Sequence, residues 1–278
     1  MELLVTKNRF DPTERTGPPP LYIMLLTVVL AAACASPESP RVDTEGATQL
    51  TSTEYQPPEQ VRNTTFVWSA EPDVDLFDER GRLIRAAQES KIIAYYAGID
   101  VTYPGFAEAL DPHYAIGIST TLQTSLAGTI RAHILEINDI HEGFKATICS
   151  QESNLATRVR DEDYRIKVFS GREEFVEFGP TTEAHRHEKW MQRHEPPRPA
   201  PETQYLSALP TSEHRWSAPT EDLFTGTGLT VTFGSDLGET MHRCEEWGRS
   251  IEPDVPDRGS ELIISPTPPE TLPAYPGW

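Results

Sequence analysis

Apolar and polar residues recur along the chain in patterns that predict two helices in its first half. In residues 82–98, apolar side chains recur at helical spacing. Asp78 is suited to cap the start of this helix and Gly98 to end it. Residues 103–110 predict a turn into a short second helix. Asp111 would end that helix, because the residue before a proline avoids helical angles.

The pattern then changes to that of β-strands. Residues 129–137 are rich in isoleucine and residues 144–149 alternate with period two, with turn residues between them. We therefore expect a β-hairpin. Residues 164–168 and 174–178 predict two further strands of the same sheet.

A last strand at residues 228–233 and a late helix from Asp236 complete the predicted elements. Their order predicts an α+β fold, in which N-terminal helices precede a curved antiparallel sheet and a C-terminal helix. Over residues 75–180, this order resembles the cone-shaped fold of the nuclear transport factor 2 superfamily. The resemblance implies a curved sheet that wraps a long helix around a pocket.

Composition divides the chain into one core and polar flanks. Residues 34–64 hold many Pro, Ser, Thr, Glu and Gln residues and few large apolar ones, so they predict a flexible tether. Residues 65–251 are the expected single α+β domain, interrupted by a polar, proline-rich segment near residues 180–220. The proline-rich tail at residues 252–278 is expected to be disordered.

Two segments of the chain resemble each other. Residues 68–77 and 216–224 both begin with Trp-Ser-Ala and reach Asp-Leu-Phe after a proline. Their flanks share no similarity. The repetition favours a common way of entering the core with a tryptophan and a phenylalanine over an internal duplication.

An apolar run without a charge occupies residues 21–33 and is followed by Cys34. At about 13 residues, it is shorter than the roughly 20 that a helix needs to span a bilayer. The run and the cysteine resemble a bacterial lipoprotein signal of the actinobacterial type, with residues 30–34 as the lipobox. Residues 1–33 would then be a signal peptide. A plain cleaved signal and a buried core helix are the alternatives.

The lipoprotein resemblance implies that Cys34 receives a diacylglyceryl group and becomes the mature N-terminus. Two acyl chains on one residue give stable anchoring. We therefore expect the protein on the outer face of the cell membrane, bound to it through a lipid anchor. Residues 1–20 hold equal numbers of basic and acidic side chains rather than a clear positive charge, which leaves the true start position open.

The chain has three cysteines, Cys34, Cys149 and Cys244. If Cys34 carries lipid, the other two remain, and an exported protein lies in an oxidising space where disulfides persist. We expect a Cys149–Cys244 disulfide. Two separate buried thiols are the alternative.

The formal net charge is −19. Nucleic acid is therefore not an expected partner, because binding it requires a basic surface. The charge also argues against electrostatic adhesion to anionic lipid. Besides the membrane anchor, the expected partners are envelope proteins or an apolar small molecule, and no cofactor is expected.

Motifs for a serine nucleophile elbow, for a zinc protease helix and for a phosphate-binding loop do not occur in the sequence. The best candidate metal ligands are His185, His187 and His194, because imidazole suits zinc and copper. A solvated polar segment beside the prolines is the plainer interpretation of these histidines.

The resemblance to the cone fold also suggests residues for a pocket. Its candidate lining residues are Tyr95, Tyr96, Tyr103, Phe106 and His133. Aromatic rings with polar tips are common in small-molecule sites, but the same rings also suit a core.

The sequence as a whole predicts a membrane-anchored extracytoplasmic lipoprotein that acts as a non-catalytic binding or interaction module. The alternatives are a small-molecule enzyme on a cone-shaped fold and an envelope metal-binding protein.

Overall fold

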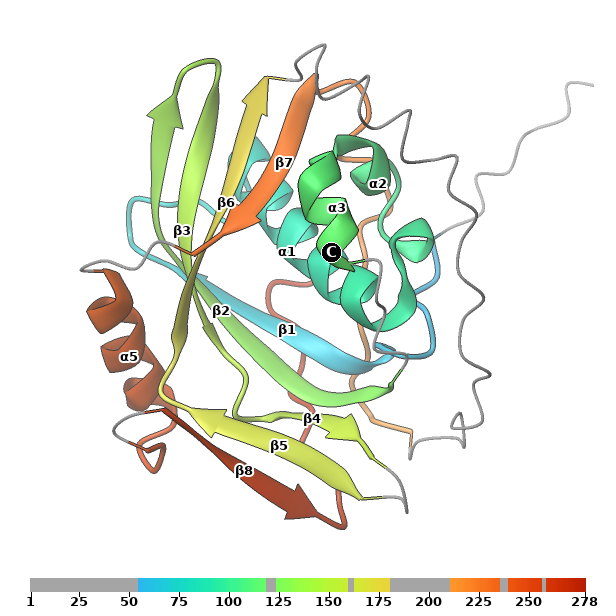
Figure 1. Cartoon of the computed structure of the whole chain (residues 1–278), viewed down its shortest axis with the longest axis vertical. Coiled ribbons are helices and arrows are strands. Elements are labelled where there is room, and N and C mark those ends of the chain that lie inside the picture. Colours follow the sequence, from blue (N-terminus) through green and yellow to red (C-terminus); the bar gives the residue numbers. More distant parts are fainter. Residues whose placement is uncertain (1–54, 119–123, 160–162, 181–210, 236–239, 257–258) are drawn as a thin grey trace, which may run out of the picture. The chain divides into compact units, whose positions relative to one another are not determined.

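The computed structural model describes residues 55–118, 124–159, 163–180, 211–235, 240–256 and 259–278. It is an α+β structure built on one large, open, mostly antiparallel sheet with a few helices (Figure 1).

Helix α1, Glu79–Ala97, is enclosed by the rest of the fold. Asp78 caps it by accepting a hydrogen bond from the amide of Gly81 at 2.7 Å. Gly98 ends it with a φ of 112°, which glycine adopts without strain. The predicted helix and both of its ends are confirmed. Every residue from Leu83 to Lys91 is buried, so polar side chains of α1 lie inside the protein.

Short helical segments follow α1. They are η1 (Ile99–Val101), α2 (Phe106–Ala109) and α3 (Pro112–Ile118). The side chain of Asp111 accepts a hydrogen bond from the amide of His113 at 2.9 Å, which caps α3. The proline after Asp111 therefore begins a new helix, because its fixed φ suits a first turn.

Within the described residues, the sheet has eight strands. Their order is β7-β6-β3-β2-β4-β5-β8, and β1 pairs with the other edge of β2. The hairpin of β2 and β3 confirms the sequence prediction. The strands span Asn63–Ala70 (β1), Leu126–Ile140 (β2), Gly143–Gln151 (β3), Leu155–Arg158 (β4), Tyr164–Phe169 (β5), Arg172–Pro180 (β6), Leu229–Gly234 (β7) and Ser260–Ser265 (β8).

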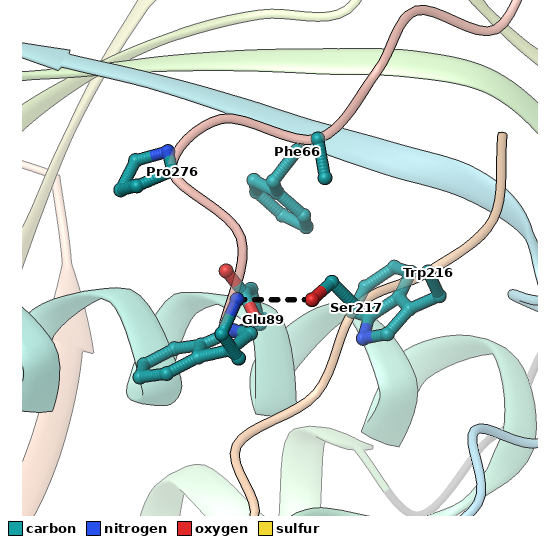
Figure 2. Close-up of a pocket in the computed structure, with 7 residues that line it drawn as sticks. Phe66, Glu89, Trp216, Ser217 and Pro276 are labelled. Atoms are coloured by element: carbon teal, nitrogen blue, oxygen red, sulfur yellow. Dashed lines mark hydrogen bonds between the residues drawn. The ribbon is translucent and has the colours of Figure 1, made fainter.

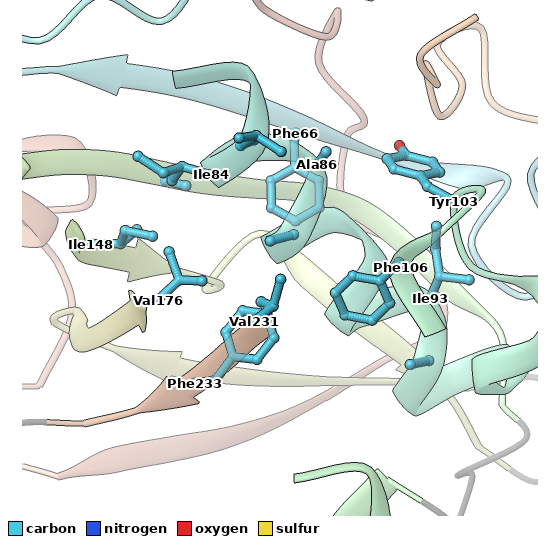
Figure 3. Packing of buried hydrophobic residues seen from close by; sticks show 14 of the residues in the cluster. Phe66, Ile84, Ala86, Ile93, Tyr103, Phe106, Ile148, Val176, Val231 and Phe233 are labelled. Carbon is cyan, nitrogen blue, oxygen red and sulfur yellow. The ribbon is translucent and has the colours of Figure 1, made fainter. Parts of the chain in front are cut away.

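The inner face of the sheet packs against α1, and together they form the main hydrophobic core. Figure 3 shows part of this core, where Ile84 of α1 lies on the side of Ile148 (β3) and Val176 (β6), and Ile93 lies beside Phe106. Aromatic rings of α2 and β7 extend it, since Phe106 lies 6.3 Å from Phe233 between ring centroids. The sheet is thus held by burial of apolar surface on this face.

Helix α5, Thr240–Ile251, packs on the outer face of the sheet, on the side opposite α1 (Figure 1). Cys244 of this helix forms a disulfide with Cys149 of β3, with 5.0 Å between their Cα atoms. The predicted disulfide is confirmed. Leu135 and the partly buried Trp247 pack around it, so α5 is attached by a covalent bond and a small apolar cluster.

Strand β1 corrects two expectations. The tether was expected to extend to residue 64, but Val61 is fully buried and β1 begins at Asn63. A strand therefore precedes the helices, and it pairs with β2 in parallel, from Asn63 opposite Ala127 to Ala70 opposite Ile134. The parallel pairing is available because α1 and the following segments connect the two strands across the fold.

The expected disorder of residues 252–278 is wrong for the described part of the tail. Residues 260–265 form β8, which pairs with β5. Beyond it, Tyr275 forms an isolated bridge to Val67 of β1, and Pro276 is buried. Prolines prevent a regular strand here, but both the amide and the carbonyl of Tyr275 bond to the main chain of β1. Part of the proline-rich interruption is also ordered, since Trp216 is buried against Phe66.

Candidate functional site

A fully buried carboxylate lies at the middle of α1. Glu89 accepts hydrogen bonds from the indole nitrogen of Trp68 at 3.0 Å, from the hydroxyl of Tyr103 at 2.6 Å and from the indole nitrogen of Trp278 at 2.7 Å. These donors come from β1, from the loop before α2 and from the tail. Three distant segments therefore meet at one acidic group.

Burial is the main influence on this carboxylate. It raises the pKa of Glu89 to about 7, although the three hydrogen bonds and the nearby charge of Arg85 act in the opposite direction. The three side chains that donate hydrogen bonds to Glu89 are all neutral. Glu89 can therefore bind or release a proton near neutral pH.

Arg85 lies one helical turn before Glu89 and is also buried. Its guanidinium stands 4.0 Å from the centroid of the Trp278 ring. It donates hydrogen bonds to the carbonyl oxygen atoms of Leu76, Pro276 and Gly277. Arg85 thus holds the tail in two ways, through the indole face and through the backbone.

Tyr103 links the carboxylate to a second tryptophan. Its hydroxyl accepts a hydrogen bond from the indole nitrogen of Trp216 at 2.7 Å and lies 3.2 Å from the carbonyl oxygen of Ser217. When Glu89 is ionised, this hydroxyl donates to it. When Glu89 is protonated, the hydroxyl can donate its hydrogen bond to the carbonyl of Ser217 and accept one from the carboxyl group. Protonation and hydroxyl orientation are therefore coupled.

A small pocket adjoins Glu89 (Figure 2). Its space suffices for about one water molecule. The tail closes it, because the amide of Trp278 donates a hydrogen bond to the hydroxyl of Ser217 at 3.0 Å. The residues around the pocket are Phe66, Glu89, Trp216, Ser217, Ala274, Pro276 and Trp278.

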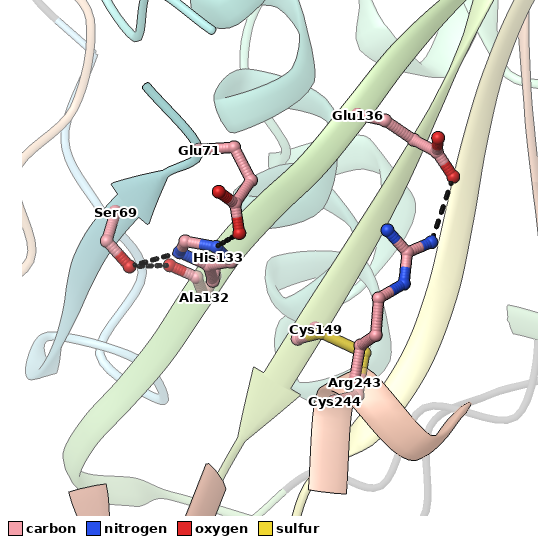
Figure 4. The surroundings of a disulfide bond; sticks show 8 residues. All are labelled: Ser69, Glu71, Ala132, His133, Glu136, Cys149, Arg243 and Cys244. Atoms are coloured by element: carbon pink, nitrogen blue, oxygen red, sulfur yellow. Dashed lines mark hydrogen bonds and ion pairs between the residues drawn. A yellow bond between two sulfur atoms is a disulfide. The ribbon is translucent and has the colours of Figure 1, made fainter. Parts of the chain in front are cut away.

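A second polar cluster lies on the outer face of the sheet, beside the disulfide (Figure 4). His133 of β2 bonds through Nδ1 to the hydroxyl of Ser69 at 2.8 Å and through Nε2 to the carboxylate of Glu71 at 3.4 Å. Its ring stacks on Trp247 of α5, with 5.5 Å between centroids. Side chains alternate along β1, so Ser69 and the inward Trp68 point to opposite faces. His133 therefore fixes α5 against the sheet and is separate from the Glu89 site.

A third cluster joins the second half of α1 to β6. Lys91 binds Glu174 at 2.5 Å, and Arg172 binds the same carboxylate at 2.9 Å and Glu152 at 2.8 Å. Burial acts to raise the pKa of Glu174, but the two cations together hold it below its ordinary value. The two cations and the two carboxylates of this cluster neutralise one another, which is typical of a structural ion-pair network.

The five residues predicted to line a pocket lie in different places. Tyr103 reaches the Glu89 site. Phe106 is fully buried in the core, and the hydroxyl of Tyr95 lies 3.3 Å from that of Tyr114. Tyr96 is partly buried against the core, and His133 is on the outer face. Only Tyr103 contacts the buried carboxylate.

Other predicted sites fall outside the described residues. The candidate metal ligands His185, His187 and His194 and the lipidation site Cys34 all do so. Within the part of the chain that the structure describes, no group of three or more His, Cys, Asp or Glu side chains is placed to hold a metal ion.

The Glu89 site was missed from the sequence, although two signals pointed to it. Arg85 and Glu89 stand four residues apart in a segment otherwise rich in apolar residues, which marks a polar patch on a buried helix. The repeated Trp-Ser-Ala segments supply Trp68 and Trp216, and both indoles donate hydrogen bonds within this site. Both tryptophans enter the core as predicted, but only the second phenylalanine does, because Phe224 is buried whereas Phe77 is 63% exposed.

None of the helices in the described ranges is both long and apolar enough to cross a membrane. Comparisons of the chain with family models, with curated proteins and with solved structures found no match.

Proposed function

We propose that this chain is an extracytoplasmic lipoprotein, anchored through Cys34 to the outer face of the cell membrane, and that it acts as a non-catalytic binding or interaction module. The lipobox at residues 30–34 supports the anchor. An exported protein also needs a domain that suits an oxidising space.

The disulfide is the observation that carries this proposal. Cys149 and Cys244 are both fully buried and are joined across 95 positions of the chain. Disulfides persist in extracytoplasmic spaces and are rare in the reducing cytosol. The disulfide thus supports export independently of the apolar run before Cys34.

The buried site supports binding over catalysis. The carboxylate of Glu89 is bonded to Trp68, Tyr103 and Trp278 of the same chain. The pocket beside it has room for about one water molecule, whereas small-molecule sites are usually hundreds of cubic ångströms. An enzyme using Glu89 would first have to expel the tail.

An apolar strand supports contact with other proteins. In β8, the side chains of Leu262, Ile263 and Ile264 are 58%, 41% and 53% exposed. An edge strand with exposed apolar side chains is prone to pair with another chain. This surface is compatible with an envelope protein partner.

We further infer that the sheet and α1 form a variant of the cone-shaped nuclear transport factor 2 fold. Two features favour this inference. The inner face of the sheet packs on the enclosed helix α1, and β2 has an irregular register between Ile134 and Glu136, which bends a strand. The variant would differ from the cone at its start, because β1 precedes α1 and lies parallel to β2.

Cell fractionation tests the proposal. The full chain and its Cys34→Ser variant would be expressed in a bacterial host, and the fractions probed before and after protease treatment of spheroplasts. We expect the wild-type chain in the membrane fraction and accessible to protease, and the variant released from the membrane. Cys149→Ser is the matched control, because it removes the disulfide and leaves the lipobox intact. A cytosolic wild-type chain would contradict the proposal.

A further inference from the structure

The last described segment, Leu272–Trp278, lies on β1 as an added peptide would. The carbonyl of Tyr275 accepts a hydrogen bond from the amide of Trp68 at 2.6 Å, and the amide of Tyr275 donates to the carbonyl of Phe66 at 3.0 Å. The carbonyl of Leu272 accepts from the hydroxyl of Thr65 at 2.8 Å. In β-augmentation, a peptide forms main-chain hydrogen bonds to the edge of a strand and places a side chain in a pocket. The resident segment has both features.

The segment is much less buried than the strand that it contacts. Phe66 and Trp68 of β1 are 7% and 1% exposed, whereas Tyr275 is 58% exposed. Within Leu272–Trp278, Pro276 is the buried residue, and Trp278 is partly buried. A segment that buries little apolar surface opens at a lower free energy than the core strands.

The groove under the segment does not depend on Trp278 for its shape. Tyr103 is bonded to Trp216, and Glu89 keeps its bond to Trp68. Arg85 keeps its bond to the carbonyl of Leu76 in the loop before α1. Release of the tail would therefore expose a preformed pocket with a carboxyl group on one side and a guanidinium on the other.

We propose that this groove, lined by Thr65, Phe66, Trp68, Glu89, Trp216 and Ser217, is a peptide-binding site, and that an extended peptide of a partner protein carrying a tryptophan can replace the resident segment. This inference deepens the binding role proposed above by naming the site and the ligand class. It does not depend on the lipid anchor.

The chemistry of the pocket selects tryptophan. The carboxyl of Glu89 accepts an indole N–H, which phenylalanine lacks, and the guanidinium of Arg85 stacks on the indole face. The resident segment competes from within the same chain at an effective concentration of about millimolar. A partner peptide therefore binds the intact chain weakly and binds it strongly when the resident tryptophan is removed.

Fluorescence anisotropy with a labelled synthetic peptide of residues 270–278 tests the inference. We expect saturable binding to the full-chain Trp278→Ala variant and at least about tenfold weaker binding to the wild-type chain, which follows from the competition. Tyr275→Ala is the matched control, because it changes an exposed side chain of the same segment and should bind the peptide as weakly as the wild type. A peptide with alanine in place of its tryptophan should not bind. Absence of saturable binding to a folded Trp278→Ala variant, or equal binding of the two peptides, would overturn the inference.

A second measurement applies if the Trp278→Ala variant does not fold. Native-state hydrogen exchange of the wild-type chain compares the amide of Tyr275 with amides of the β2–β3 hairpin. We expect the Tyr275 amide to exchange at least about tenfold faster, through local opening. Equal rates would show that the segment leaves only on global unfolding and would overturn the inference. Neither result bears on the anchor, which the fractionation tests separately.

Discussion

The indole nitrogen of Trp278 donates a hydrogen bond to the carboxylate of Glu89 at 2.7 Å across 189 positions of the chain. This contact attaches a proline-rich tail to the buried centre of α1. Trp278 is therefore one of the groups that stabilise the ionised form of the fully buried Glu89, together with Trp68, Tyr103 and Arg85. This contact therefore links the stability of the fold, the position of the tail and the protonation of Glu89.

The raised pKa of Glu89 predicts a pH dependence of stability. The folded chain holds this proton up to a pKa of about 7, whereas the unfolded chain releases it near the ordinary value of 4.5. Between these values the folded state binds more protons, so the free energy of unfolding should fall as pH rises from 4.5 to 7, by about 3 kcal/mol. Urea unfolding of the wild type and of Glu89→Gln at several pH values measures this.

The Glu89→Gln variant should lack this part of the pH dependence, because glutamine does not titrate. The informative quantity is the difference between the two stability curves, since other groups contribute equally to both. The pKa of Glu174 is lowered in the folded state, so the stability that Glu174 contributes is lost as pH falls below the ordinary value of 4.5. Its effect therefore lies at lower pH than that of Glu89. Parallel curves between pH 4.5 and 7 would show that Glu89 does not hold a proton in the folded state.

Removal of Trp278 should destabilise the protein moderately. Trp278→Ala deletes a partly buried ring, one hydrogen bond to Glu89 and the stacking partner of Arg85. We expect a loss of about 2 kcal/mol, below the range for a tryptophan in a closed core. Tyr275→Ala, in the same segment but exposed, should change stability by less than about 0.5 kcal/mol. Equal effects of the two variants in chemical unfolding would contradict the role given to Trp278.

The ion pair between Lys91 and Glu174 offers a double-mutant test. Lys91→Met leaves the buried Glu174 with Arg172 as its partner, so we expect a loss of about 3 kcal/mol, the lower end for breaking a buried pair. Combining it with Glu174→Gln removes the buried charge that has lost one of its two cations, and should recover part of the loss. If the two substitutions were simply additive in thermal unfolding, the pair would not be coupled.

The disulfide should contribute strongly to stability. Cys149 and Cys244 close a loop of 95 residues, for which chain entropy predicts about 4–5 kcal/mol. The Cys149→Ala/Cys244→Ala variant should lose most of this amount in chemical unfolding. Added reductant should destabilise the wild type and leave the variant unchanged. A reductant effect on the variant would point to a different origin of the stabilisation.

Local signals in the sequence predicted the parts of the fold that local interactions determine. Asp78 and Gly98 mark the ends of α1 because capping and left-handed geometry depend on neighbouring residues. The β2–β3 hairpin followed from alternation and turn residues. The Cys149–Cys244 pair followed from counting cysteines in a chain expected to be exported.

Non-local pairing determined what the sequence did not reveal. β1 pairs with β2 in parallel over a separation of 64 positions, and no local pattern fixes such a partner. Proline content predicted a disordered tail, but pairing of β8 with β5, backbone bonds to β1 and the contacts of Trp278 hold its described part in place. The Glu89 site combines residues from five segments that lie far apart in the chain, so its signs in the sequence were limited to the spacing of Arg85 and Glu89 and the repeated Trp-Ser-Ala motif.

Intact mass tests most directly our proposal that the protein is exported and lipid-anchored. The full chain would be purified from membranes of a bacterial host and its mass measured with and without reduction. We predict a chain that begins at Cys34, carries a diacylglyceryl group and gains two hydrogens when the Cys149–Cys244 disulfide is reduced. An unlipidated chain that still begins at Met1, with free thiols at all three cysteines, would contradict both the anchor and the export on which the account rests.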